Sequence, residues 1–394
     1  MTYPSIKILP RRDHRFRSGS PWIFSNEIEM DAAAKALPAG SLVRIMAPNG
    51  HIMGVAHFNP HSLIAARLLT RNKDAGVDRK FVRRRIDRAL AVRDRLYERP
   101  FYRLVHAEAD GLPGLVIDRL GDLVVIQPNT AGWDGMTDIL VEAVDAAVKP
   151  SCIVVRGDAP VRALEGLAES VRVAKGTVPE RLEIEENGLA FVVDVMGGQK
   201  TGWYFDQRDN RAFAARLAGG QRVLDLYSYA GGFGLTAAAA GATEVVCVDR
   251  AEAALELGRA SAERQGVAER CSFRRSEAFA ALDAMADGKE RFGLVIADPP
   301  PFVKARKDLA AGLKGYAKLA RTSATLVAEA GFLCIACCSH NVPAATFLET
   351  VYAGIKDAGR GARLLREAGA GPDHPLHPAL PESGYLKFLA FALD

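Results

Sequence analysis

The stretch Arg222–Arg250, RVLDLYSYAGGFGLTAAAAGATEVVCVDR, decides the fold. It begins with an apolar run that ends at Asp225, passes through a turn containing Gly231 and Gly232, and enters an alanine-rich segment. A second apolar run then closes on Asp249. Short apolar runs bounded by turn residues are typical of buried parallel strands, and the alanine-rich segment between them favours a helix. The stretch therefore predicts a β-α-β unit with a carboxylate at the end of each strand.

This glycine-rich turn also predicts a ligand site, with a tight turn that only packs a helix on a strand as the alternative. In open α/β sheets, ligands bind beyond the carboxyl ends of the strands, where an acid such as Asp249 can accept hydrogen bonds from a ribose. The turn has neither the spacing of the dinucleotide fingerprint nor the Lys-Ser/Thr of a phosphate loop, so NAD and ATP are not favoured. The pattern resembles the first motif of class I S-adenosylmethionine-dependent methyltransferases.

The composition indicates a globular chain of two or three domains. The 394 residues are 49% hydrophobic and 25% charged, with a net charge of +4, and this length exceeds what one core usually holds. No apolar run reaches membrane-spanning length and no apolar signal segment opens the chain, so we expect a cytoplasmic protein without a membrane partner. The six cysteines fit neither a disulfide framework nor a zinc spacing, which predicts reduced thiols and no metal site.

The first domain is predicted to be a small β-barrel. Residues from about 5 to 72 show short β-like runs separated by Gly, Pro and Asn. Basic side chains adjoin the aromatic element SGSPWIF (18–24) at Lys7, Arg11, Arg12, Arg15 and Arg17. Cations can bind phosphates and aromatic rings can stack on bases, which predicts an RNA surface, whereas the alternative is a solvated face beside core aromatics. These elements, with GVAHFNPHSLIAARLL (54–69), resemble a PUA domain, an RNA-binding module.

An amphipathic basic helix is predicted from Asp78 to Arg99. Apolar residues such as Phe81 and Ile86 recur near helical spacing, and arginines and lysines fill most other positions. The polar face could lie along a phosphate backbone, or it could be solvated and paired with acids of the same helix. We expect a mixed role, in which changing Arg83, Arg84 and Arg85 to Glu weakens RNA binding and its salt dependence.

Three domains are expected in total. Residues 1–74 form the PUA-like domain, residues 75–188 form the basic helix with a small α/β linking domain, and residues 189–394 form a catalytic domain with alternating strands and helices. In the catalytic domain, strands are predicted near residues 191–195, 222–227, 244–249, 271–276, 292–298, 331–338 and 385–393.

A polar segment before the first nucleotide-type strand has the composition of a loop that folds over a ligand. It reads GGQKTGWYFDQR (197–208) and is too polar for a core element. In the methyltransferase family that the chain resembles, this loop and the start of the following helix border the methionine end of the cofactor, so the resemblance implies cofactor contacts by Lys200, Thr201, Asp206, Gln207 and Arg208. The alternative for Asp206 is capping of the helix that follows.

The run LVIADPPPF (294–302) is predicted to be a buried strand that delivers Asp298 to the catalytic edge of the sheet. Prolines fix the backbone φ angle and prevent a helix, so the chain must leave the strand extended at Pro299. The alternative is a carboxylate that simply ends a strand before a turn. Enzymes that methylate the adenine amino group carry two prolines before an aromatic residue, and the extra Pro301 before Phe302 argues against that substrate.

The next predicted strand, GFLCIACCSH (331–340), ends in two cysteines. Alternation places Cys334 and Cys338 on one face and Cys337 on the other. Methylation of a pyrimidine at carbon 5 needs a temporary nucleophile at carbon 6, and a thiolate meets that need. A free thiol is mostly protonated at neutral pH, so a neighbouring group must assist, and His340, Lys200 or Lys304 could do so. The alternative is an inert cysteine at a strand end.

These motifs together resemble the ribosomal RNA large-subunit methyltransferase I family over nearly the whole chain. The resemblance rests on the PUA-like start, GGQKTGWYFDQR, DLYSYAGGFG, DPPPF, CCSH, and the closing DHP and YLKF elements. It implies an α/β fold: a Rossmann-like class I methyltransferase domain with a seven-stranded mixed sheet, preceded by a β-barrel PUA-like domain and a small α/β linking domain. It also implies methylation of carbon 5 of a cytosine in 23S rRNA, with RNA or the large-subunit particle as partner.

The resemblance assigns residue roles as well. Cys338 matches the central Cys of the family's Ser-Cys-Ser motif and is the expected nucleophile, although position 337 is Cys instead of Ser, and Asp298 is expected to orient the base. The expected contacts to S-adenosylmethionine further include Asp225, Tyr227, Gly231, Gly232, Phe233, Asp249, Arg250, Glu277, Asp298 and Pro299. Glu277 stands where an Asp is usual, and His374 lies in a loop that borders the active site of the family but could equally cap a turn. Guanine N7 methylation, a noncatalytic role in ribosome assembly, and a homodimer stay open.

Overall fold

The computed structural model describes residues 3–394, which divide into two compact units. Unit 1 contains the described residues up to Glu180 together with Val195–Trp203 and Pro372–Pro381. Unit 2 contains Arg181–Asp194, Tyr204–Gly371 and Glu382–Asp394. Across residues 3–394, no helix combines the length and the apolar character that a membrane crossing requires.

Unit 1 begins with a five-stranded sheet in the order β1-β3-β4-β5-β2. Its strands are β1 (Ser5–Lys7), β2 (Trp22–Ile23), β3 (Ser41–Met46), β4 (Ile52–Phe58) and β5 (Ala66–Thr70). The pair β1 and β3 is parallel, and the other pairs are antiparallel. Backbone hydrogen bonds join Leu9 to Glu27 and Glu29 to Lys7, so the chain after β1 also pairs with the chain after β2. The short strands expected in this part of the sequence are confirmed.

A second five-stranded sheet of unit 1 has the order β10-β9-β8-β7-β6. Its strands are β6 (Phe101–His106), β7 (Leu115–Leu120), β8 (Leu123–Pro128), β9 (Cys152–Gly157) and β10 (Ser170–Lys175). The helices α3 (Arg79–Leu96) and α5 (Thr137–Val148) pack on each other and share one hydrophobic core with this sheet. The alternating strand and helix pattern of this region is therefore confirmed.

The basic helix α3 forms as predicted, but one of its arginines has a different role. Asp78 caps the helix by accepting a hydrogen bond from the Phe81 amide at 2.8 Å, and Phe81 and Ile86 are buried. Arg93 was expected on the polar face, yet it is 1% exposed. Both of its terminal nitrogens bond to Asp110, at 2.7 and 2.8 Å. A buried guanidinium needs a paired carboxylate, and Asp110 provides one.

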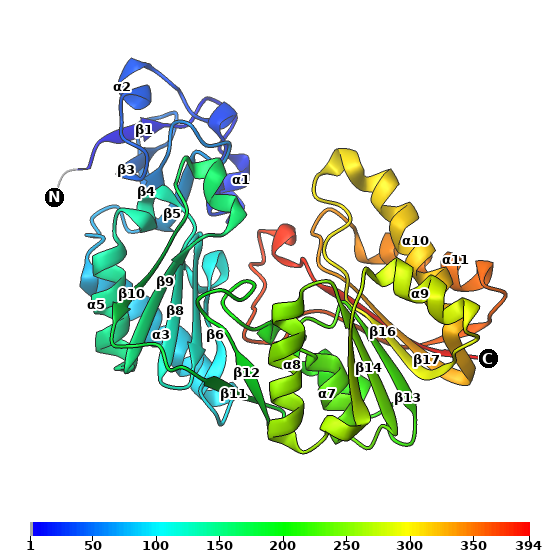
Figure 1. Ribbon diagram of the computed structural model, residues 1–394. Helices are drawn as coiled ribbons and strands as arrows, with labels where there is room; N and C mark the ends of the chain where they lie inside the picture. Colours follow the sequence, from blue (N-terminus) through cyan, green and yellow to red (C-terminus); the bar gives the residue numbers. More distant parts are fainter. Residues whose placement is uncertain (1–2) are drawn as a thin grey trace. The chain divides into compact units, whose positions relative to one another are not determined.

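Unit 2 holds a seven-stranded sheet in the order β15-β14-β13-β16-β17-β19-β18. Figure 1 labels its strands β13, β14, β16 and β17. Its strands are β13 (Arg222–Leu226), β14 (Glu244–Asp249), β15 (Cys271–Arg275), β16 (Phe292–Ala297), β17 (Val327–Cys337), β18 (Ala362–Ala368) and β19 (Lys387–Leu393). The strand β19 runs antiparallel to both of its neighbours, and the other pairs are parallel. This mixed sheet confirms the predicted fold of the catalytic domain.

The set of strands differs from the prediction at two places. The run near 191–195 forms β12 (Leu189–Val193), which pairs with β11 (Leu182–Glu186) in a separate hairpin. The seventh strand of the large sheet is β18, which was not predicted. Its sequence, ARLLREA, places three charged residues among four apolar ones, and none of its residues is buried because the strand lies at the edge of the sheet. It therefore lacks the continuous apolar run of a buried strand.

Helices cover both faces of this sheet. The helices α9 (Ala278–Asp287), α10 (Leu309–Leu326) and α11 (Ala344–Asp357) share one core with Leu224 and Leu226 of β13. The helix α7 (Gly232–Ala239) approaches the opposite face, because a Cβ atom on Gly234 would lie 2.6 Å from the Cys247 sulfur and 3.2 Å from Asp225 Oδ2. Side chains alternate between the two faces of a strand, so Asp225 lies on the α7 face, opposite to Leu224.

Candidate active site

The turn between β13 and α7 is tightly bent. Gly231 has a φ angle of 75°, and Tyr227 and Tyr229 also have positive φ angles, of 59° and 49°. Residues other than glycine seldom adopt this conformation, and such strained positions cluster at functional sites. Asp249, at the end of β14, stabilises the turn by accepting hydrogen bonds from the amides of Tyr229 and Ala251, both at 2.9 Å. The carboxylate at the end of β14 thus fixes the turn that follows β13, and the ligand site expected here stays a prediction.

The other residues near this turn that were predicted to contact the cofactor lie in environments that differ from one another. Phe233 is buried between the ring of Phe388 and the guanidinium of Arg211, and Arg250 is exposed. Glu277 is exposed at the start of α9 and lies close enough to Tyr227 to influence its hydroxyl. Burial, with Glu277 as a smaller cause, raises the pKa of Tyr227 to about 12.

Asp225 is a buried carboxylate that is only half satisfied. Its Oδ2 accepts a hydrogen bond from the Gly234 amide at 2.8 Å, whereas its Oδ1 has no partner among the described residues. Burial raises the pKa of Asp225 to about 7; the Gly234 hydrogen bond opposes this shift, and Asp298 adds to it. An orphaned buried acceptor costs free energy unless a donor reaches it. A cationic ligand with N–H donors, such as S-adenosylmethionine, fits this site.

We expect Asp225→Asn to change the pH dependence of stability in the absence of ligand. The folded pKa lies above the ordinary value of 3.8, so the stability of the native protein falls as pH rises from about 4 to about 7. The amide cannot ionise and escapes this loss. Urea denaturation should therefore show Asp225→Asn gaining roughly 2 kcal/mol over the native protein between pH 5 and pH 8. If Asp225→Asn and the native protein differed in unfolding free energy by the same amount at both pH values, the raised pKa of Asp225 would be contradicted. The control is Asp283→Asn, which changes an exposed carboxylate of α9.

The segment that follows Tyr204 is fixed by its own polar contacts. Asp206 accepts a hydrogen bond from the Tyr385 hydroxyl at 2.6 Å, and its carbonyl accepts one from the Gly371 amide. Gln207 accepts from Asn210 at 2.7 Å. Arg208 lies 3.7 Å from the carboxylate of Glu186. These three predicted cofactor residues therefore lie together in unit 2, and their role toward the cofactor stays a prediction.

Lys200 and Thr201 belong to unit 1. Thr201 is buried, and its hydroxyl donates to Asp118, which also accepts from Arg103. Lys200 is exposed and has a φ angle of 50°. The predicted contacts of both residues with the cofactor are not tested by these positions.

The ends of β16 and β17 bring Asp298 and Cys338 to neighbouring positions at one edge of the sheet, because the two strands are parallel and paired. The Cys338 sulfur lies 3.7 Å from the Pro299 carbonyl oxygen. Ser339 donates its hydroxyl to the Val303 carbonyl at 2.6 Å, and Asn341 donates to the Lys304 carbonyl at 3.2 Å. Hydrogen bonds thus join the loop that follows β16 to the loop that follows β17.

The two adjacent cysteines have different environments. Cys337 is fully buried in the core on the side of α10, close to Tyr316. Burial raises the pKa of Cys337, and the neighbouring Tyr316 hydroxyl opposes this shift. Cys338 is half-buried. Cys334 and Cys337 are thus in the core, as expected, and Cys338 is the partly exposed thiol at the strand end.

Two residues near Cys338 were missed in the sequence analysis. Burial raises the pKa of Tyr204, and the further causes include Tyr229, Asp298 and Cys338, so its hydroxyl lies among these groups. Lys387, the first residue of β19, is 8% exposed and lies close to Cys337 and Cys338. A lysine in the otherwise apolar strand KFLAFAL was the only sequence signal for the latter.

Of the residues expected to assist the thiol, His340 lies directly after Ser339. Partial burial lowers the pKa of His340; Lys387 and Arg306 add to this lowering, whereas Glu382 opposes it. The imidazole is therefore uncharged at neutral pH. Lys304 is exposed, and its backbone carbonyl is the group that contacts Asn341.

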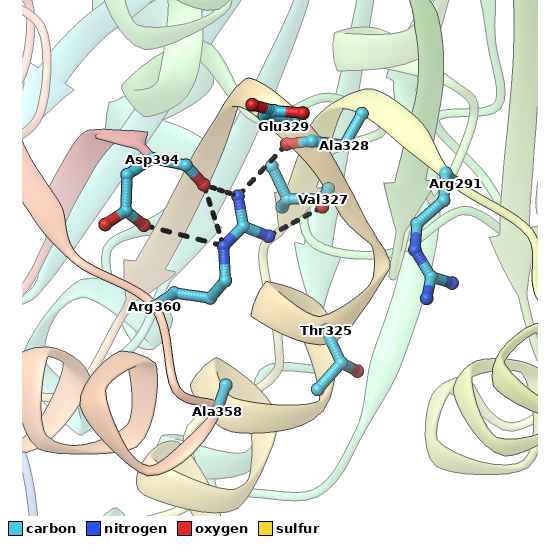
Figure 2. Close-up of a pocket in the computed structure, with 8 residues that line it drawn as sticks. All are labelled: Arg291, Thr325, Val327, Ala328, Glu329, Ala358, Arg360 and Asp394. Atoms are coloured by element: carbon cyan, nitrogen blue, oxygen red, sulfur yellow. Dashed lines mark hydrogen bonds and ion pairs between the residues drawn. The ribbon is translucent and has the colours of Figure 1, made fainter.

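A surface pocket of unit 2 lies away from these residues. Figure 2 shows its lining by Arg291, Thr325, Val327, Ala328, Glu329, Ala358, Arg360 and Asp394. Arg291 precedes β16 and Val327 begins β17, so the pocket is at the amino ends of the parallel strands, whereas Asp298 follows β16. The Arg360 guanidinium donates to the backbone carbonyls of Ala324, Val327, Ala328 and Asp394. Its donors are thus used within the protein.

Two protein-family models match the chain. A model of S-adenosylmethionine-dependent methyltransferases matches residues 168–360, and a model of PUA-like domains matches residues 6–71. Among curated proteins, the ribosomal RNA large subunit methyltransferase I of Pseudoalteromonas atlantica is 36% identical over 388 residues, which is 98% of each chain. The protein of the same name from Aliivibrio fischeri is 36% identical over 392 residues, again 98% of each chain.

Two solved structures share the fold over the whole chain. One is a protein of Streptococcus mutans described as a SAM-dependent methyltransferase, with a TM-score of 0.83, 19% sequence identity, and coverage of 99% of this chain and 100% of that chain. The other, a methyltransferase complexed with SAH, has a TM-score of 0.84 and 19% identity and covers 100% of both chains. The predicted fold class and the predicted cofactor, S-adenosylmethionine, are confirmed.

Proposed function

The chain belongs to the ribosomal RNA large subunit methyltransferase I family, which makes it an S-adenosylmethionine-dependent rRNA methyltransferase, and we propose that it methylates carbon 5 of a cytosine through a cysteine adduct. The observation that carries this proposal is the pair formed by Cys338 and Asp298 at the ends of two adjacent strands. Of the three cysteines of this segment, Cys338 is the one that is not buried.

The chemistry of a pyrimidine ring explains the need for this thiol. Carbon 5 becomes nucleophilic when a thiolate adds to carbon 6, and elimination restores the ring after the carbon 5 proton is removed. When bound, S-adenosylmethionine supplies the methyl group as an electrophile on a sulfonium sulfur. Cys338 forms and releases the bond to carbon 6, and Asp298 orients the base by accepting a hydrogen bond from the exocyclic amino group.

The surroundings of the donor site support the same assignment. Asp249 ends β14 and fixes the turn that follows β13, where an acceptor for the ribose of the donor is expected. Asp225 offers a buried acceptor to the cationic end of the donor. Pro299 keeps the chain extended beside the Cys338 sulfur. Together these groups would hold the two reactants and exclude water from the reacting carbon.

The basic helix α3 supports a role of unit 1 in RNA binding. Arg83 is paired with Asp87 at 2.7 Å. Arg85 donates to the Leu69 carbonyl and stacks over Phe81. The sequence-based choice of Arg83, Arg84 and Arg85 for mutation therefore includes an arginine that stabilises the fold. Arg84 and Arg88 are both exposed on this helix, which makes them the better probes of phosphate contact.

We expect Arg84→Glu with Arg88→Glu to weaken binding to 23S rRNA fragments and to reduce its salt dependence. Each lost phosphate contact lowers the slope of log K against log salt by roughly 0.7–0.9. The slope should therefore fall by about 1 to 2 in filter-binding titrations. The control is Lys356→Glu with Arg363→Glu, which makes the same charge change at exposed positions of α11 and β18. An equal loss in both double variants would indicate a general charge effect and not contact by α3.

Product analysis tests the proposed function itself. Purified protein, labelled S-adenosylmethionine and unmodified 23S rRNA should give 5-methylcytosine as the labelled nucleoside after complete digestion. Label on another nucleoside, such as 7-methylguanine, would overturn the carbon 5 assignment. A protein that binds the RNA without transferring label to free rRNA or to large-subunit particles would contradict the proposal as a whole.

A further inference from the structure

Lys387 is a buried lysine at the active-site edge of the sheet. It opens β19 and is the register partner of Cys337 across the antiparallel pair of β17 and β19. Its ammonium donates to the Ser339 carbonyl at 2.7 Å and to the Tyr385 carbonyl at 3.3 Å. No carboxylate forms an ion pair with it within residues 3–394. A buried cation without an acidic partner is costly, so its retention needs an explanation.

Among the groups around Lys387, the two thiols are the ones that interact with its charge. Burial lowers its pKa, whereas Cys337 and Cys338 both oppose this lowering, as expected if the thiolate forms interact favourably with the ammonium. The other charged or titratable groups at this edge are Asp298, Tyr204, Tyr316 and His340, with Glu382 and Arg306 beside His340. Asp298 disfavours a negative charge on sulfur, and His340 is uncharged at neutral pH. Lys387 is the cation that interacts with both thiols.

We propose that Lys387 is a positioning residue that makes Cys338 reactive, by holding the Ser339 peptide and by stabilising the thiolate of the preceding residue. The hydrogen bond to the Ser339 carbonyl fixes the turn immediately after Cys338. The Ser339 hydroxyl fixes the same turn from the other side through Val303. A positive charge within reach lowers the pKa of a cysteine and raises the thiolate fraction at neutral pH. This inference assigns a role within the proposed function and rests on Cys338 being the nucleophile.

The reactivity of Cys338 can be measured without RNA or a methyl donor. We would follow alkylation of Cys338 by iodoacetamide as a function of pH, with the modified peptide quantified by mass spectrometry. Lys387→Met removes the charge and the donors, Lys387→Gln retains a donor without the charge, and Lys387→Arg retains the charge. The midpoint of the pH profile should rise by about 1 pH unit in the Met and Gln variants, which is a rate about 10-fold lower at pH 7. The Arg variant should stay near the native profile.

The outcomes separate this inference from a purely structural role. If the Met and Gln variants keep the native midpoint, Lys387 does not stabilise the thiolate and the inference is overturned, whatever their thermal stability. If the Gln variant alone keeps the native midpoint, the hydrogen bond suffices and the charge has no role. Because the assay requires no methyl transfer, a shifted midpoint supports the inference even if 5-methylcytosine is not the product, and product analysis then decides the proposed function separately.

Discussion

Cys338→Ala should lower methyl transfer to carbon 5 by at least about 10³-fold, because the substitution removes the atom that activates the pyrimidine ring. Without addition at carbon 6, carbon 5 has no electron pair to accept the methyl group. Binding of the methyl donor should change little, because the predicted donor contacts come from Asp225, Asp249 and their neighbours. Initial rates with labelled S-adenosylmethionine and 23S rRNA, together with calorimetric binding of the donor, measure both quantities.

The matched control for this variant is Cys271→Ser. Cys271 is a half-buried thiol on the edge strand β15, which is separated from β17 by three other strands of the sheet. Its loss should leave the rate within about twofold of the native value, since surface substitutions away from the site have small effects. A Cys338→Ala protein that produces 5-methylcytosine at the native rate would rule out the adduct mechanism.

Asp298→Ala should lower kcat by roughly 10² to 10³-fold, the range expected when one well-placed polar group is removed from a reacting centre. The carboxylate ends β16 beside the predicted nucleophile, so its loss leaves the base free to rotate away from the thiol. It is also a predicted contact of the methyl donor, and we expect donor affinity to fall by a smaller factor, about 10-fold. Single-turnover rates at saturating donor separate the two effects.

Asp298→Asn should retain part of the activity because the amide oxygen can still accept a hydrogen bond. Asp283→Ala, which removes an exposed carboxylate of α9, serves as the control and should behave as the native protein. If Asp298→Ala changed only the affinity for the donor and left kcat intact, its role would be limited to the donor site.

The strand ends of the catalytic domain could be predicted from the sequence for a simple reason. Buried parallel strands appear as uninterrupted apolar runs, so the acids Asp225, Asp249 and Asp298 stand out where each run stops. Parallel neighbours end at the same edge of a sheet. The sequence therefore indicates that Cys338 and Asp298 meet, even though 40 positions separate them along the chain.

Other features depend on distant parts of the chain and had a weak local signal or none. Lys387 reaches Cys338 only because β19 returns antiparallel between β17 and β18. Arg93 occurs among other arginines of a helix, and nothing near it in the sequence distinguishes the one that is buried against Asp110. The edge strand β18 has no buried residue because one side of it is open. In each case the partner comes from a different element, which local periodicity does not report.

The most direct test of the account is a search for the covalent adduct itself. A 23S rRNA fragment containing 5-fluorocytosine would be incubated with the protein and S-adenosylmethionine, digested, and analysed by mass spectrometry. Because fluorine replaces the proton that must leave carbon 5, the reaction should stop after methyl transfer, with the methylated base bound to Cys338. Efficient methylation of the matching unsubstituted fragment, without any nucleotide attached to Cys338 in the fluorinated one, would contradict the account.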